Sequence, residues 1–189
     1  MVSNSGSARK CRLSDILLIV MVIILAASLI GIFIFKGQSK KRDAQLKDHS
    51  ANTAAVMYEL LRHDVRDDLV KATKTEHYME VADKFALYKK IPYCGYPSGM
   101  AQVIYSYMFQ LEKDTYAFAD SLRAGEVENQ DAGRSRLIKG TEVIGTLCGL
   151  ADEYVSGKLP KDSGIKNEKE MIKELKRTYD SQMTGGQSD

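Results

Sequence analysis

The sequence predicts an all-α protein in which a single N-terminal transmembrane helix is followed by an up-and-down four-helix bundle and a weaker fifth C-terminal helix. Three observations lead to this fold class. An uncharged apolar run lies near the N-terminus, apolar residues recur every three or four positions in the rest, and Gly- and Pro-containing stretches separate the periodic segments. The predicted regions are a basic tail (1–15), an anchor (16–35), a linker (36–42), the bundle (43–180) and a disordered tail (181–189).

The predicted anchor, residues 16–35, is a run of 20 residues without a charge. At about 1.5 Å per residue, such a helix matches a hydrocarbon core of about 30 Å. A cleaved signal peptide would have a shorter apolar region ending in small residues, whereas this run ends in Phe33, Ile34 and Phe35. We therefore expect an uncleaved anchor in the lipid bilayer. Within it, Ala27 and Gly31 have the spacing of small residues that allows two membrane helices to pack closely.

The orientation of the anchor is weakly specified, because Lys and Arg residues flank it on both sides. Arg9, Lys10 and Arg12 precede the apolar run, and Lys36 and several further basic residues follow it. A long domain is translocated largely regardless of its charge, so the short basic tail can remain inside. This favours a bacterial inner (plasma) membrane protein with its C-terminal domain in the periplasm, and the cytosolic orientation stays open.

The charge balance of the predicted soluble part excludes one class of partner. The chain has 27 Lys and Arg and 25 Asp and Glu, and all but three of the basic and one of the acidic residues follow residue 35. The soluble part therefore carries 24 charges of each sign. Nucleic-acid binding proteins present a basic patch or stripe, so no nucleic-acid partner is expected.

The first two bundle helices are predicted from apolar spacing and from a start signal. A helix over 43–72 places one apolar stripe inward, consisting of Leu46, Ala54, Met57, Leu61, Val65 and Leu69. Thr73 and Glu76 have the spacing of a capping box, which predicts that a second helix starts there and runs to about Lys90. The loop at 91–99 follows, because it contains two prolines and two glycines.

The remaining helices follow from the same periodicity. Ser98 is a suitable N-cap for a helix over 99–124, which Gly125 ends, and a fourth helix covers 131–156, ending at Gly157. A weaker fifth helix covers 164–180. Gly145 and Gly149 lie four residues apart beside the apolar stripe of the fourth helix. Because glycine costs about 1 kcal/mol relative to alanine inside a helix, these two glycines predict a close helix contact.

Two cysteines of the predicted bundle could carry redox chemistry. Cys94 lies in the Pro-rich loop and Cys148 on the apolar face of the fourth helix. In an oxidising compartment they could form a disulfide that ties the loop to that helix. The alternative is that Cys148 is a small core residue and Cys94 an ordinary loop thiol, since unpaired cysteine is often buried.

No sequence motif predicts a metal, a cofactor or catalysis. None of His49, His63 and His77 has a glutamate three positions before it, as carboxylate-bridged di-iron bundles require, and no zinc motif occurs. The cluster around His63 and Asp67 has neighbouring arginines and is typical of a solvated, salt-bridged face. Nucleophile-elbow and phosphate-loop patterns are also missing from the sequence, so we do not expect an enzyme.

Tyrosine is the one unusual feature of local composition. Seven of the ten tyrosines fall between positions 78 and 116, around the Pro-rich loop. Tyrosine combines a large apolar body with a polar tip, which suits interfaces. Tyr93, Tyr96 and Tyr105 are therefore the predicted partner or ligand surface, although such rings could also simply complete the end of a bundle.

Three hypotheses of function follow. The first is a non-enzymatic, single-pass membrane protein whose bundle acts as a protein-interaction, accessory or scaffold subunit of a membrane-associated complex. The second is a sensory or small-ligand-binding bundle. The third is a thiol-redox or metal-binding protein that uses the cysteines or histidines.

Overall fold

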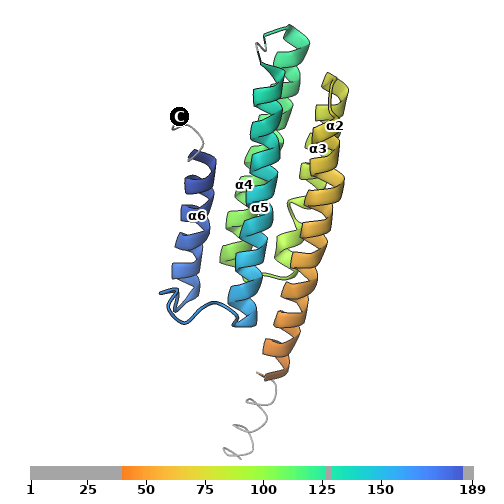
Figure 1. Ribbon diagram of the computed structural model, residues 1–189. Coiled ribbons are helices and arrows are strands. Elements are labelled where there is room, and N and C mark those ends of the chain that lie inside the picture. Colours follow the sequence, from red (N-terminus) through yellow and green to blue (C-terminus); the bar gives the residue numbers. More distant parts are fainter. Residues whose placement is uncertain (1–39, 127–128, 185–189) are drawn as a thin grey trace, which may run out of the picture. The chain divides into compact units, whose positions relative to one another are not determined.

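The computed structural model describes residues 40–126 and 129–184, and every regular element in these ranges is helical (Figure 1). The prediction of an all-helical chain is confirmed for this part. The chain divides into two compact units, 1–44 and 45–189. In the first unit only residues 40–44 are described, and they are helical although the linker was predicted to reach residue 42. The predicted tail (1–15), the anchor (16–35), the Ala27 and Gly31 spacing and residues 185–189 lie outside the described residues.

The second unit begins with a first helical segment (residues 45–71) that changes its helix type twice. Residues 45–59 are α-helical, η1 (Leu60–Arg66) is a π-helix, and α2 (Asp67–Lys71) is α-helical again. Its buried apolar residues Met57, Leu61, Val65 and Leu69 recur every four positions. In an α-helix that spacing drifts by about 40° per step, and the wider π-helical turn keeps the stripe facing the core. Leu46 was predicted inward but is 41% exposed, because it precedes the part that packs.

The π-helical turn is held by α3 (Thr75–Tyr88). The Lys84 ammonium donates to the backbone oxygen of Asp64 at 3.3 Å, to the Asp64 carboxylate and, at 2.6 Å, to Asp68. The Tyr88 hydroxyl also donates to the Asp64 carboxylate. Burial alone would raise the pKa of Asp64, but the hydrogen bonds from Lys84 and Tyr88 and the positive charge of Lys84 lower it below its ordinary value. The carboxylate form of Asp64 therefore joins the two helices.

Two predicted helix starts are wrong in detail. The Thr73–Glu76 capping box is not formed, because α3 begins at Thr75 with Lys74 at its cap, and the Thr73 amide donates instead to His77 Nδ1 at 3.2 Å. The cap of α4 (Ser98–Ala124) is Pro97 rather than Ser98. Proline supplies a fixed φ there, so Ser98 is already the first helical residue.

The predicted helix ends at Gly125 and Gly157 are confirmed. Gly125 follows α4 with φ of 72°, and Gly157 follows α5 (Gln130–Ser156) with φ of 70°. This left-handed conformation favours glycine because it has no Cβ. The next amide in each case donates back to the preceding helix, from Glu126 to Ser121 and from Lys158 to Glu153. Asn129 caps the start of α5 by accepting from the Ala132 amide at 3.0 Å.

Contacts between the long elements show that chain neighbours run in opposite directions. The start of α3 meets the end of α4, where the Tyr78 and Phe118 rings are edge to face with centroids 4.9 Å apart. The start of α5 meets the same end of α4, at Gly133 beside Phe118. Ser50 donates to Asp152 at 2.8 Å, which joins the beginning of the first helical segment to the end of α5. In Figure 1 these elements stand side by side.

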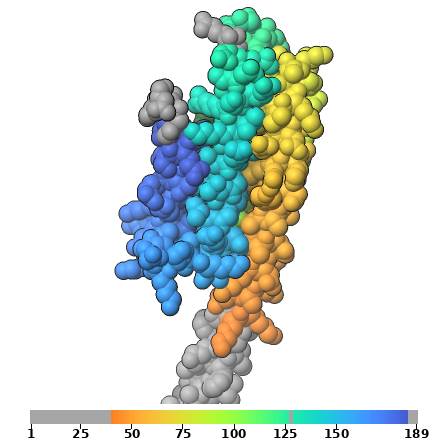
Figure 2. Space-filling view, in the orientation of Figure 1, coloured from red at the N-terminus to blue at the C-terminus, as the bar shows by residue number. Residues whose placement is uncertain are grey.

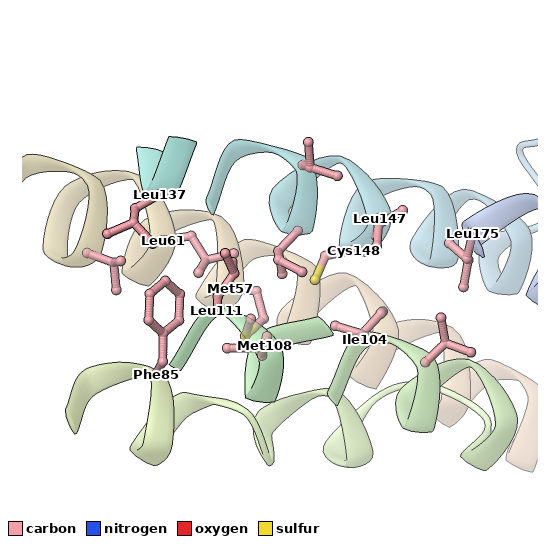
Figure 3. Close-up of a cluster of buried hydrophobic side chains, with 14 of the residues drawn as sticks. Met57, Leu61, Phe85, Ile104, Met108, Leu111, Leu137, Leu147, Cys148 and Leu175 are labelled. Atoms are coloured by element: carbon pink, nitrogen blue, oxygen red, sulfur yellow. The ribbon is translucent and has the colours of Figure 1, made fainter. Parts of the chain in front are cut away.

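One continuous apolar core fills the space between the helices (Figure 3). Its largest fully buried side chains are Tyr78, Phe85, Met57, Leu69, Met100, Ile104, Met108, Leu111, Ile144, Leu147, Met171 and Leu175. α6 (Glu168–Thr184) packs against α4 and α5. It begins and ends four residues later than the predicted helix over 164–180, so residues 181–184 are helical rather than disordered.

The predicted close helix contact is wrong in position. A Cβ added at Gly145 or Gly149 would meet nothing within 4 Å. Close approach occurs instead at Gly140, where a Cβ would collide with the Leu111 side chain of α4. Gly140 is buried whereas Gly149 is exposed, because the face of α5 that packs lies to one side of the Gly145 and Gly149 row.

Candidate partner-binding surface

A row of three aromatic rings at the surface, Tyr93, Tyr105 and Phe109, forms the best-defined surface feature, and we call it the aromatic strip. Tyr93 comes from the short 3-10 helix η2 (Ile91–Cys94), and the other two come from α4. The ring centroids of Tyr93 and Tyr105 are 5.9 Å apart, and those of Tyr105 and Phe109 are 6.3 Å apart with nearly parallel planes. Tyr93 is 44% exposed and Phe109 36%. The strip is therefore continuous, and its two end rings are open to solvent.

The local sequence explains why these rings meet. Tyr105 and Phe109 are four residues apart, which places them on one face of α4. Pro92 lies in the first turn of η2, the short helix that follows α3. This turn changes the direction of the chain and brings Tyr93 beside α4. The Tyr93 hydroxyl donates to Gln102, one turn before Tyr105. That hydrogen bond holds the Tyr93 ring against the helix.

Two lysines add positive charge to the aromatic strip. The Lys89 ammonium lies 4.8 Å from the Phe109 ring centroid and 5.9 Å from that of Tyr105. The Lys113 ammonium lies 4.4 Å from the Phe109 centroid. Lys89 is also paired with Glu112, and both of these side chains are only 13% exposed. The strip thus combines aromatic faces with fixed cations, an arrangement suited to contact with another protein.

Tyr96, the third predicted surface residue, is a core residue and does not belong to the strip. It is 4% exposed, and its hydroxyl donates to the backbone oxygen of Cys148 in α5 at 3.0 Å. Phe109 takes its place in the surface. The signal that could have found Phe109 was its four-residue spacing from Tyr105, with Lys113 four residues further on, whereas a count of tyrosines passes over a phenylalanine.

The two cysteines are free thiols in the structure. Cys94 is exposed and Cys148 is 1% exposed. They are therefore a loop thiol and a core residue, which was the alternative to a disulfide between them. Burial raises the pKa of the Cys148 thiol from its ordinary 9.0 to about 12, although the hydrogen bond with Tyr96 opposes this rise. Cys148 is therefore a protonated core side chain near neutral pH.

This difference between the thiols predicts their reactivity. The chain's third cysteine, Cys11, lies outside the described residues and is replaced by serine for this test. In that Cys11→Ser background, Cys94 should react with a thiol reagent in the native chain, whereas Cys148 should react only after unfolding. Mass spectrometry of the labelled full-length chain measures both, with Cys94→Ser and Cys148→Ser variants as controls. Fast native labelling of Cys148, or labelling of both thiols only after reduction, would contradict the expectation.

Metal-ligating side chains do not gather in the described structure. Across 40–126 and 129–184, no three of the His, Cys, Asp and Glu side chains come together in a way that could hold a metal ion. His63 is 57% exposed, and its ring nitrogens are 3.7 Å from Glu59 and 3.8 Å from Asp67 on the outer face of the first helical segment. That arrangement is a solvated charged face.

Comparison with protein-family models, curated proteins and solved structures finds no match to this chain. The class of protein rests on the elements themselves, which form a helical bundle with an exposed aromatic and cationic strip.

Proposed function

We propose that this protein is a single-pass, membrane-anchored helical bundle that acts as a non-enzymatic interaction or scaffold subunit of a membrane-associated complex. The aromatic strip is its contact surface. The observation that carries the proposal is a continuous row of three rings, exposed at Tyr93 and Phe109, with two lysines against it. Exposed aromatic side chains are enriched in protein interfaces and depleted on free surfaces.

The membrane part of the proposal rests on the sequence of residues 16–35. In this proposal that segment anchors the up-and-down bundle. Among the residues that the structure describes, none of the helices is both long and apolar enough to cross a bilayer. An uncharged run of 20 residues is long enough to do so, and the chain contains that run next to the described part. In this proposal residues 36–189 lie in the periplasm of a bacterium.

The chemistry of the strip indicates what kind of partner it binds. Tyr93 and Phe109 offer apolar ring faces, and Lys113 places a cation beside them, whereas the charge of Lys89 is already paired with Glu112. A partner surface with apolar side chains bordered by carboxylates complements both features. Substitution of Tyr93 and Tyr105 by alanine removes ring area at the surface without opening the core, so binding should fall while folding is retained.

Site-specific photo-crosslinking in intact cells tests this contact. A photoreactive residue at Tyr93 or Phe109 of the full-length chain should crosslink to one defined membrane-associated protein. The same residue at Val70, which is 48% exposed outside the strip, is the matched control. Introducing Tyr105→Ala should weaken the crosslink from Tyr93. Equal crosslinking from Val70, or none from the strip, would overturn the proposed surface.

A second measurement tests the anchor separately. The full-length chain should stay with membranes during alkaline extraction, and removal of residues 16–35 should release it. Release of the intact chain would overturn the membrane part while leaving the crosslinking result interpretable.

A further inference from the structure

A second surface feature lies between the first helical segment and α5 and shares no residue with the aromatic strip. It is a hollow of about 460 Å³, within the range of small-molecule sites. One wall is the π-helical turn, with Leu61, Arg62 and Arg66, preceded by Tyr58. Figure 2 shows the face on which the first helical segment (orange to yellow) stands beside α5 (teal).

The hollow is open because Gly145 of α5 has no side chain. Gly145 lines the hollow, and a Cβ added there would meet nothing within 4 Å. Its backbone is not in the left-handed region that favours glycine, since among the described glycines only Gly125, Gly157 and Gly164 have positive φ. Neither packing nor backbone conformation therefore requires glycine at this position. A larger side chain at this position would extend into the hollow.

The polar groups of the hollow leave one positive charge without a carboxylate. Arg66 pairs with Glu142 across the hollow at 2.9 Å. Arg62 stacks over the Tyr58 ring, with its guanidinium carbon 5.3 Å from the centroid, and donates to the Tyr58 hydroxyl. In the part of the chain that the structure describes, no Asp or Glu lies within 4.0 Å of the Arg62 guanidinium.

The other polar side chains of the hollow are already used. Thr141 donates to the Leu137 carbonyl at 2.9 Å and Thr146 donates to the Glu142 carbonyl at 3.2 Å, both within α5. The group left to recognise a ligand is therefore the Arg62 guanidinium. Its planar fork of N–H donors matches a carboxylate. The apolar surface of the hollow comes mainly from the 48% exposed Tyr58, with Leu61, 3% exposed, beneath it.

We infer that this hollow binds a small organic monocarboxylate with an apolar body. The carboxylate pairs with Arg62 and the apolar body lies over Gly145, between Tyr58 and Leu61. The uncompensated guanidinium supplies one positive charge for an anionic group, and the Tyr58 ring beside it favours a ligand that also has a hydrocarbon or aromatic part, which inorganic phosphate lacks. The site extends the molecule's role beyond the proposed contact surface and does not depend on it.

Calorimetric titration of the full-length 189-residue chain tests the inference with 3-phenylpropionate as the probe. We expect saturable binding of this carboxylate and none of 3-phenylpropanamide, which has the same body without the charge. Inorganic phosphate, an anion without an apolar body, should also fail to bind. Arg62→Gln should weaken 3-phenylpropionate binding by roughly ten-fold or more. Equal binding of the amide and the acid would overturn the inference.

The glycine row of α5 supplies a matched steric pair. Gly145→Leu extends a side chain into the hollow, and Gly149→Leu adds the same side chain at an exposed position that does not line it. Binding should be lost in the first variant and retained in the second. Circular dichroism of each variant verifies folding, which is expected because neither position has a neighbour within 4 Å of a Cβ. Undiminished binding in folded Gly145→Leu, or no binding by the unaltered chain, would overturn the site.

Discussion

Phe85→Ala is expected to lower the free energy of unfolding by roughly 3 to 5 kcal/mol. The Phe85 ring is 0% exposed and projects from α3 into the core (Figure 3). Its removal takes away buried apolar area and leaves a cavity that the surrounding helices fill only in part. Domains of this size have a total stability of about 5 to 15 kcal/mol, so the substitution should remove a large fraction of it.

Leu87→Ala is the matched control for this substitution. Leu87 is in the same helix, two residues further on, and is 70% exposed. Its truncation should change the unfolding free energy by no more than about 0.5 kcal/mol. Denaturant unfolding of the full-length chain, followed by circular dichroism, measures both variants. A cost for Leu87→Ala as large as that for Phe85→Ala would contradict the assignment of the two faces of α3.

Gly95→Ala is expected to destabilise the protein by roughly 1 to 3 kcal/mol. Gly95 follows η2 and lies against the first helical segment. An added Cβ would stand 2.6 Å from the backbone oxygen of His49 and would also collide with the Thr53 side chain. The φ of Gly95 is −133°, which alanine adopts readily, so the cost comes from lack of space rather than from backbone conformation. A backbone oxygen in a helix cannot yield as a flexible side chain can.

Gly145→Ala is the counterpart and should change stability in the opposite direction. A Cβ at this helical position meets no neighbour within 4 Å, so alanine should stabilise the chain by up to about 1 kcal/mol. Thermal and denaturant unfolding of both variants checks the pair. A neutral Gly95→Ala variant would show that the loop is not packed against the first helical segment as described.

The helices and their ends could be predicted from the sequence because both depend on local properties of the chain. Apolar spacing identified the buried stripe through Met57, Leu61, Val65 and Leu69, and the residue type alone located the ends at Gly125 and Gly157. The π-helical turn was not predicted. Its only signal in the sequence is that apolar residues repeat every four positions. This repeat is slightly longer than one turn of an α-helix and shorter than one turn of a π-helix, so it does not indicate a π-helix unless the neighbouring helices are known.

The candidate sites could be predicted only in part, because a site depends on which faces meet. The sequence by itself determined that residues 40–126 and 129–184 are all-helical, their helix boundaries within a few residues, and an aromatic region that includes Tyr93 and Tyr105. Only the tertiary structure decided that Tyr96 is buried against α5 while Tyr93 joins α4, and that Gly140 packs closely while Gly145 borders a hollow. Periodicity reports the face of one helix, whereas burial and open space arise from the opposing side chains of another.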